Sequence, residues 1–152
     1  MSEPPSLEPV PVPDEPVEWH RVLGTDDLPE GRVTTVTIGR RSLAVSNVED
    51  GGYGAIDNHC PHQGGPLGEG SIEKGWLRCS WHGYDYSPCN GTSPGAHGDG
   101  VEAFAVDVRS DGVYVALPPE EERPRTVSDV LVETMVNWGV TSVFGMVGHS
   151  NL

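Results

Sequence analysis

Between residues 18 and 117 the sequence consists of short β-type runs that are interrupted by turn signals. Gly39-Arg40 is a turn signal between the second and third runs, and Ser110-Asp111-Gly112 is another between the last two. Many short strands joined by glycine-rich turns predict an all-β fold, here a small antiparallel sandwich or barrel. The predicted strands are Glu18–Val22, Val33–Ile38, Arg41–Ser46, Gly54–Asp57, Trp76–Cys79, Tyr84–Ser87, Phe104–Arg109 and Val113–Leu117.

The segment before this region has a different composition. Residues 1–17 contain six prolines and four acidic residues, and they contain no Lys or Arg. Such a segment buries too little apolar surface to offset the entropy lost on ordering, so we expect a disordered tail.

A charged, proline-rich stretch at residues 118–125 predicts a linker after the β region. Beyond it, Thr126 is a suitable helix N-cap, and Gly139 is a suitable helix terminator. A buried strand is predicted at Val140–Met146, so residues 126–152 read as the truncated start of an α/β domain. The apolar residues at helical spacing are Val127, Val130, Leu131, Met135 and Trp138.

The charge balance is strongly acidic, with nine Lys and Arg against 23 Asp and Glu and a formal net charge of -14. This charge disfavours binding to nucleic acid or to anionic membranes. It suits either docking on a basic patch of a redox partner or solubility alone, and both interpretations stay open. No apolar run reaches the roughly 18 residues that span a bilayer, and no signal-like N-terminus is present. Three cysteines do not make a disulfide framework, so we expect a cytoplasmic protein.

Two short loops carry the chemistry. Cys60-Pro61-His62 and Cys79-Ser80-Trp81-His82 are separated by 16 residues, and each offers one thiolate and one imidazole. Thiolates stabilise ferric iron, whereas neutral imidazoles leave an iron less negatively charged and easier to reduce. Flanking glycines and prolines allow backbone amides to turn toward bound sulfides.

This C-x-H, C-x-x-H pattern resembles the Rieske family of 2Fe-2S proteins, and the resemblance covers about residues 18–117. The resemblance implies one 2Fe-2S cluster per chain. It implies that Cys60 and Cys79 bind one iron, and that His62 and His82 bind the other. The alternative is a structural zinc site, but the C-x-H pair is tightly spaced for chelating a single ion.

Differences from respiratory-chain Rieske proteins indicate a ferredoxin-like or oxygenase-like type. Gly65 and Trp81 stand where the respiratory proteins carry an extra pair of disulfide-bonded cysteines. Tyr84 replaces a serine whose hydroxyl raises the reduction potential. Tyr86 stands where the respiratory proteins carry a tyrosine that bonds a ligand sulfur, so this interaction is expected here.

The remaining candidate residues are given structural roles. The His59 side chain is expected to point away from the cluster. Cys89 is expected to be a buried or idle thiol, and His20 and His97 have no ligand-type neighbours. Trp81 and Tyr84 are expected to cover the cluster.

Residues 126–152 resemble the beginning of thiamine-diphosphate enzymes of the pyruvate oxidase and acetolactate synthase group. The cofactor-activating glutamate of these enzymes lies further along the chain, so this chain is not expected to bind thiamine diphosphate itself. The other interpretation is a helical extension that packs on the Rieske domain. The matching residues are Gly139, Val140, Val143, Phe144, Gly145, Gly148 and Asn151.

The sequence therefore favours one-electron transfer as the redox domain of a larger thiamine-diphosphate-dependent, oxidase-like enzyme. A free Rieske ferredoxin that serves an oxygenase, or an iron–sulfur redox sensor, stays open as an alternative. The expected partner is a redox protein or the fused thiamine-dependent domain. No 2-His-1-carboxylate iron site is present, so the chain is an electron-transfer component without a complete catalytic site of its own.

Overall fold

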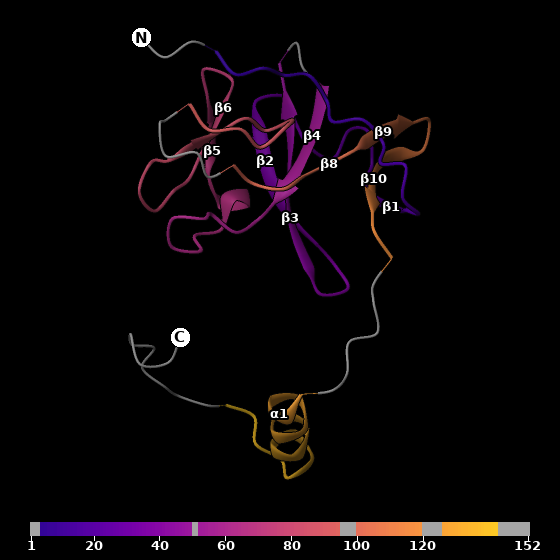
Figure 1. The fold of residues 1–152 in the computed structure, drawn as a ribbon, viewed down its shortest axis with the longest axis vertical. Coiled ribbons are helices and arrows are strands. Elements are labelled where there is room, and N and C mark those ends of the chain that lie inside the picture. Colours follow the sequence, from indigo (N-terminus) through magenta and orange to yellow (C-terminus); the bar gives the residue numbers. More distant parts are fainter. Residues whose placement is uncertain (1–3, 50–51, 95–99, 120–125, 143–152) are drawn as a thin grey trace. The chain divides into compact units, whose positions relative to one another are not determined.

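The computed structural model describes residues 4–49, 52–94, 100–119 and 126–142. The chain divides into two units, residues 1–120 and residues 121–152. The first holds the strands, and the second holds α1, the one α-helix of the described residues (Figure 1). Within the described ranges, no helix has both the length and the apolar character that a bilayer crossing requires.

The strands of the first unit form three antiparallel sheets. One sheet has the order β2-β3-β4-β8, the second has the order β1-β10-β9, and the third has the order β5-β6-β7. The predicted all-β antiparallel fold is confirmed. The strand bounds are β1 Glu18–Leu23, β2 Arg32–Ile38, β3 Arg41–Val48, β4 Gly52–Asp57, β5 Ser71–Glu73, β6 Trp76–Arg78, β7 Asp85–Tyr86, β8 Ala103–Phe104, β9 Val106–Arg109 and β10 Gly112–Leu117.

The predicted turns lie where the hairpins need them. β2 and β3 pair up to Ile38 and Arg41, so Gly39-Arg40 is the connecting turn, and Gly39 has a φ of 55°. β9 and β10 pair up to Arg109 and Gly112, so Ser110 and Asp111 alone make that turn. Glycine accepts a positive φ without steric cost, and this is why a two-residue turn fits at Gly39-Arg40.

Two elements were not predicted, and one predicted strand is divided. β5 and a short 3-10 helix, Leu67–Glu69, lie between the two Cys-His loops. The predicted strand Phe104–Arg109 is interrupted at Ala105, because β8 pairs with β4 whereas β9 pairs with β10. The carbonyl of Ala105 still accepts a hydrogen bond from Ala116, at 2.9 Å, so the chain crosses from one sheet to the other without losing this bond.

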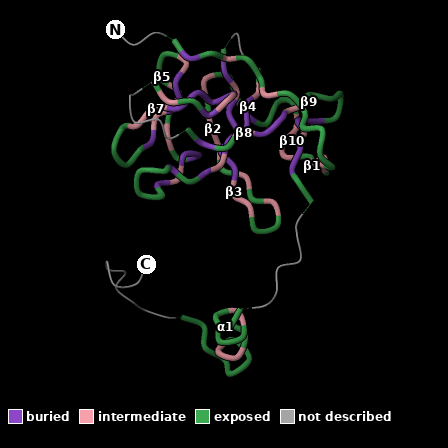
Figure 2. The backbone as a smooth tube through the Cα atoms, viewed as in Figure 1, coloured by how far each residue is buried: buried purple, intermediate pink, exposed green. Residues whose placement is uncertain are grey.

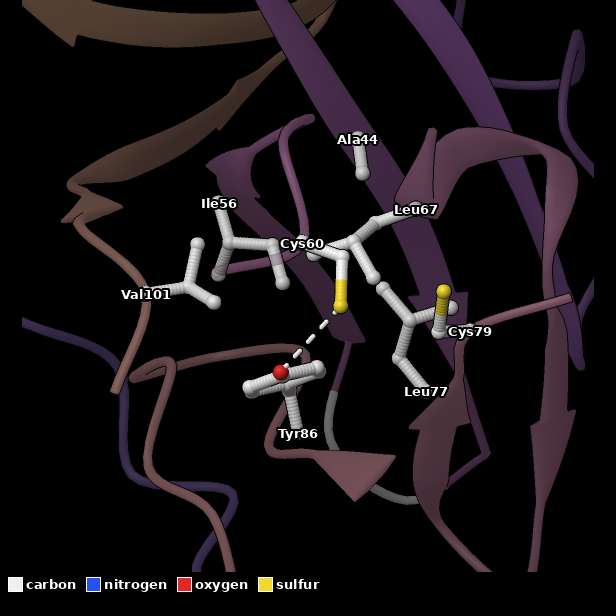
Figure 3. Close-up of a cluster of buried hydrophobic side chains, with 8 residues drawn as sticks. All are labelled: Ala44, Ile56, Cys60, Leu67, Leu77, Cys79, Tyr86 and Val101. Carbon is white, nitrogen blue, oxygen red and sulfur yellow. Dashed lines mark hydrogen bonds between the residues drawn. The ribbon is translucent and has the colours of Figure 1, made fainter. Parts of the chain in front are cut away.

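Two hydrophobic cores fill the first unit. One lies between the four-stranded sheet and β10 and includes Leu43, Phe104 and Val115. The other includes both Cys60 and Cys79, packed with Ile56, Leu67, Leu77 and Tyr86 (Figure 3). Buried positions concentrate in β3, β4, β6 and β10 (Figure 2). The two loops are therefore built on a packed core.

The segment predicted to be a disordered tail makes specific contacts along its described part, residues 4–17, which we call the N-terminal strap. The strap contains no helix or strand. Pro5 is buried, and the carbonyl of Ser6 accepts hydrogen bonds from the Ser87 hydroxyl at 2.8 Å and from the Asn90 amide at 3.2 Å. The strap then leads into β1 (Figure 1). Its composition alone did not indicate these contacts.

The second unit contains helix α1, Val127–Asn137, as predicted. Thr126 and Asp129 form a capping box, in which each side chain bonds the backbone N–H of the other. Gly139, with a φ of 81°, follows the C-cap Trp138. None of the helical residues is buried (Figure 2).

The predicted strand at Val140–Met146 is not present over residues 140–142, and its remaining part lies outside the described residues. The described part of the second unit is thus a capped helix, and the α/β character expected for this region is not shown. The linker predicted at residues 118–125 also lies largely outside the described residues.

Candidate metal centre

The two Cys-His loops close with the same pattern of backbone hydrogen bonds. In loop 1, residues 60–65, the Cys60 N–H donates to the Gly65 carbonyl at 2.9 Å, and the Gly64 N–H donates to the Cys60 carbonyl at 2.7 Å. In loop 2, residues 79–84, the Cys79 N–H donates to the Tyr84 carbonyl at 2.8 Å, and the Gly83 N–H donates to the Cys79 carbonyl at 3.0 Å. The cysteine of each loop therefore sits at the base of an equivalent turn.

A glycine with positive φ makes each of these turns possible. Gly64 has a φ of 75° and Gly83 has a φ of 72°, and each is four residues after the cysteine of its loop. A residue with a Cβ adopts such a φ only with strain. The positive φ that each turn requires thus explains why Gly64 and Gly83 are glycines.

The two sulfur atoms lie at the buried end of the site. Cys60 and Cys79 are each 2% exposed. The hydroxyl of Tyr86 lies 3.3 Å from the sulfur of Cys60, as Figure 3 shows. When that sulfur is a thiolate, the Tyr86 hydroxyl is the donor. The expected contact of Tyr86 with a cysteine sulfur is confirmed.

Burial raises the pKa of the Cys79 thiol, and the adjacent sulfur of Cys60 raises it further. Hydrogen bonds from the backbone N–H groups of Trp81 and His82 act in the opposite direction and lower this pKa. Burial likewise raises the pKa of Tyr86, as does its contact with Cys60, so Tyr86 keeps its proton. The sulfur end is a desolvated pocket in which thiolates are favoured only by donors or by a bound cation.

The two imidazoles lie at the exposed end of the site. The Nδ1 atoms of His62 and His82 are 3.2 Å apart, and the two rings meet edge to face with centroids 4.7 Å apart. Both residues are exposed. Tyr84 stacks on His62 with ring centroids 4.4 Å apart and an interplanar angle of 21°. A side chain of loop 2 therefore supports the imidazole of loop 1.

These four side chains fit a two-iron cluster. Each iron of a Rieske cluster takes two protein ligands, whereas a structural zinc ion takes all four ligands on one centre. The structure separates the donors into a buried sulfur pair and an exposed imidazole pair. Among the described residues, no group of three His, Cys, Asp or Glu side chains converges on one ion. The pairing favours the two-iron interpretation.

Trp81 and Gly65 connect the two loops directly. A Cβ atom built on Gly65 would lie 3.0 Å from two indole carbons of Trp81 and 3.1 Å from the sulfur of Cys79. The indole therefore packs against the bare backbone of Gly65. Trp81 is nevertheless 55% exposed, so it covers the site on one side only.

Asn58 supports loop 1 through hydrogen bonds, and the sequence analysis did not single it out. Its side-chain oxygen accepts from the Gly68 N–H at 2.6 Å, and its amide donates to the Ser42 hydroxyl at 2.9 Å. Its backbone bonds both Ser42 and Leu67. Asn58 is only 6% exposed, so these bonds are shielded from water. Its only sequence signal is a polar residue directly after a β run.

An ion-pair network holds loop 2 and was also not predicted. Arg78, next to Cys79, bonds both carboxylate oxygens of Asp85 at 2.8 Å and one oxygen of Glu73 at 2.7 Å. These bonds connect β5, β6 and β7. The hydrogen bond and the charge of Asp85 raise the pKa of Arg78 above its ordinary value.

The described residues that were assigned no metal role are buried or have other contacts. The ring of His59 bonds the Asp57 carboxylate at 2.9 Å. Cys89 is 2% exposed, and burial raises its pKa. His20 lies 3.7 Å from Glu18. His97 lies outside the described residues.

A small antiparallel β domain with a buried thiolate pair and an exposed imidazole pair defines an iron–sulfur electron carrier. The family model of the Rieske [2Fe-2S] domain matches residues 18–100, which is more than half of the chain. The chain belongs to the Rieske 2Fe-2S family, and membership implies a 2Fe-2S cluster.

Relatives and solved structures agree with this assignment. Apoptosis-inducing factor 3 from Homo sapiens is 32% identical over 108 residues, which are 70% of this chain and 18% of the relative. A chain from a complex of reduced oxygenase and oxidized ferredoxin in carbazole 1,9a-dioxygenase is 28% identical, with a TM-score of 0.58, over 63% of this chain and 99% of that chain. The Sphingomonas yanoikuyae B1 ferredoxin has the same fold, with a TM-score of 0.60 and 22% identity, over 66% of this chain and 100% of that one.

The chain spans only about a fifth of the length of the curated relatives it matches. The similarity therefore concerns the Rieske domain of these larger proteins.

Proposed function

We propose that this chain passes single electrons, with Cys60 and Cys79 as ligands of one iron and His62 and His82 as ligands of the other. The observation that carries the proposal is the separation of the four donors into a buried sulfur pair and an exposed imidazole pair. A cluster held by these residues would supply one-electron chemistry, with the imidazoles of His62 and His82 making their iron the easier one to reduce.

The side chains around the site support this task. The exposed imidazoles lie at the surface, where a partner protein can approach them. The buried cysteines keep water from the sulfur end. The Tyr86 hydroxyl donates toward the Cys60 sulfur and stabilises the additional negative charge of the reduced state.

Metal analysis and spectroelectrochemistry test the proposal. We expect two irons per chain, a Rieske-type EPR signal after reduction, and a titration that fits one electron. The potential should lie in the lower half of the Rieske range of about -150 to +300 mV, because Tyr84 replaces the potential-raising serine. One zinc per chain without visible absorption would contradict the proposal.

We further propose that this domain acts inside a larger, thiamine-diphosphate-dependent oxidase-like enzyme. The support is α1, which forms where the sequence analysis expects the first helix of such enzymes. The helix also exposes a series of apolar side chains. They are Val127, Val130, Leu131, Val132, Val136 and Trp138, each between 49% and 87% exposed.

The alternative is a ferredoxin that serves an oxygenase, and the solved complex of an oxygenase with a ferredoxin favours it. Sequencing the reading frame beyond codon 152 separates the two. A downstream thiamine-diphosphate domain supports the first proposal, and an immediate stop codon supports the second. In either case, deletion of residues 126–152 should leave the iron content and the potential unchanged.

A further inference from the structure

The N-terminal strap and loop 1 contact consecutive residues of the same short segment of chain. Tyr86 is the last residue of β7, and Ser87 follows it directly. The hydroxyl of Tyr86 reaches the sulfur of Cys60 at 3.3 Å. The hydroxyl of Ser87 reaches the Ser6 carbonyl of the strap at 2.8 Å. The strap therefore bonds the residue that directly follows Tyr86.

The strap is attached at more than one point. Asn90 donates a second hydrogen bond to the same Ser6 carbonyl, at 3.2 Å. Pro5 is buried, and it packs on the turn between β5 and β6, where a Cβ built on Gly75 would lie 3.2 Å from the Pro5 ring. Both attachment points belong to the part of the chain that carries loop 2 and β7.

The turn that receives the strap is itself closely packed. Ser87 and Thr92 close it with a backbone bond of 2.7 Å, and the Gly91 N–H bonds the Ser87 carbonyl at 2.9 Å. Its Pro88 carbonyl contacts β4 so closely that no Cβ would fit on Gly54. Ser87 is fully buried. Displacement of Ser87 would therefore displace the adjacent Tyr86.

Further along the strap, contact is looser. A cavity of about 180 Å³ separates residues between Val10 and Val17 from Phe104, Ala116 and Pro118. The hydrogen bonds to the Ser6 carbonyl are accordingly the contacts that attach the strap to the rest of the first unit.

From these contacts we infer that the N-terminal strap is a positioning element for Tyr86. By bonding Ser87 and Asn90, the strap fixes the distance between the Tyr86 hydroxyl and the Cys60 sulfur and so raises the reduction potential. This inference rests on the proposed role of Cys60 as an iron ligand.

A double-mutant cycle on the full chain tests the inference. Tyr86→Phe removes the bond to Cys60 and should shift the potential to more negative values. Ser87→Ala removes the main bond to the strap and should give a smaller shift of the same sign. The double variant should have the potential of Tyr86→Phe alone, because the strap acts only through that hydroxyl. Non-additivity of this kind separates positioning from general destabilisation.

A second variant covers the case in which Ser87→Ala does not fold. Removal of residues 1–7 deletes Pro5 and Ser6 and should give the same negative shift. Val12→Ala is the matched control within the strap, since Val12 is 52% exposed, and it should leave the potential unchanged.

The outcomes separate the inference from the proposed function. Equal shifts from the strap variants in the parent and in Tyr86→Phe, or no shift at all, would overturn the positioning role while leaving the cluster assignment intact. An unchanged potential in Tyr86→Phe itself would also overturn the inference, whereas a parent protein without bound iron would overturn the proposed role of Cys60.

Discussion

Loop 1 and loop 2 close in the same way but are supported by different interactions. In each loop, the backbone N–H and the carbonyl of the cysteine are hydrogen-bonded across the turn. A glycine with a positive φ lies four residues after each cysteine. Below loop 1 lies the buried amide of Asn58, whereas beside loop 2 lies the partly exposed ion pair of Arg78 and Asp85. The local turn thus determines the shape of each loop, and unlike neighbours determine where that shape is held.

The difference also has an energetic side. A buried hydrogen-bonding group that loses its partner costs about 1–3 kcal/mol, whereas an exposed ion pair contributes little and is screened by salt. We therefore expect loop 1 to depend on its support more strongly than loop 2.

The largest effect should come from the histidines, one in each loop. Replacing His62 or His82 by Cys should retain some iron but abolish the Rieske EPR signal, because imidazole ligation of one iron defines that signal. His59→Gln is the matched control, since His59 is exposed and bonds Asp57. Retention of the parent signal in His62→Cys would show that the ligand assignment is wrong.

Among substitutions of residues that support the two loops, Asn58→Ala should lower the stability most. It leaves the Gly68 N–H and the Ser42 hydroxyl without their buried partner, and we expect a loss of about 1–3 kcal/mol in stability. Thermal bleaching of the visible absorption measures it. Ser42→Ala, which removes only one of these bonds, should have a smaller effect. Equal stability of Asn58→Ala and the parent would remove the proposed difference between the loops.

Asp85→Asn should lower the stability by less than Asn58→Ala does. The pair lies partly in solvent, with 42% and 19% of the Arg78 and Asp85 side chains exposed, so the loss should shrink further in high salt. Asp107→Asn, in a similar pair with Arg109 in β9, is the control and should not affect the rate of cluster loss. A larger effect than that of Asn58→Ala would reverse the ranking of the two supports.

Cys89→Ser should have the smallest effect on the metal centre, because Cys89 belongs to neither loop. Iron content and EPR spectrum are expected to match the parent. Burial keeps this thiol protonated by raising its pKa, so it does not compete for iron. Loss of iron from this variant would mean that a third thiolate takes part in the site.

Much of the fold was predictable because local signals agree with it. The turns at Gly39-Arg40 and Ser110-Asp111 separate clear β runs, and α1 begins at a capping box that is readable in the sequence. β5 was missed because Ser71–Glu73 has only three residues, too few for an alternating pattern to stand out. The interruption at Ala105 was missed because pairing with two different sheets is a tertiary choice.

The candidate site was predictable in its residues but not in its supports. The Cys-His spacing alone brings Cys60, His62, Cys79 and His82 into consideration. Asn58 and the strap gave no comparable signal, because Asn58 acts through partners ten and 16 residues away and Ser6 acts through a backbone carbonyl. Contacts of this kind depend on the folded arrangement and not on the type of residue.

The contact between Trp81 and Gly65 has an evolutionary consequence. A side chain at position 65 would occupy the space of the indole, so the two positions cannot change independently. Among homologous sequences that retain a large aromatic residue at position 81, position 65 should remain glycine. Sequences that lose the aromatic residue should be free to accept larger residues at position 65, and an alignment would reveal the two positions as a covarying pair.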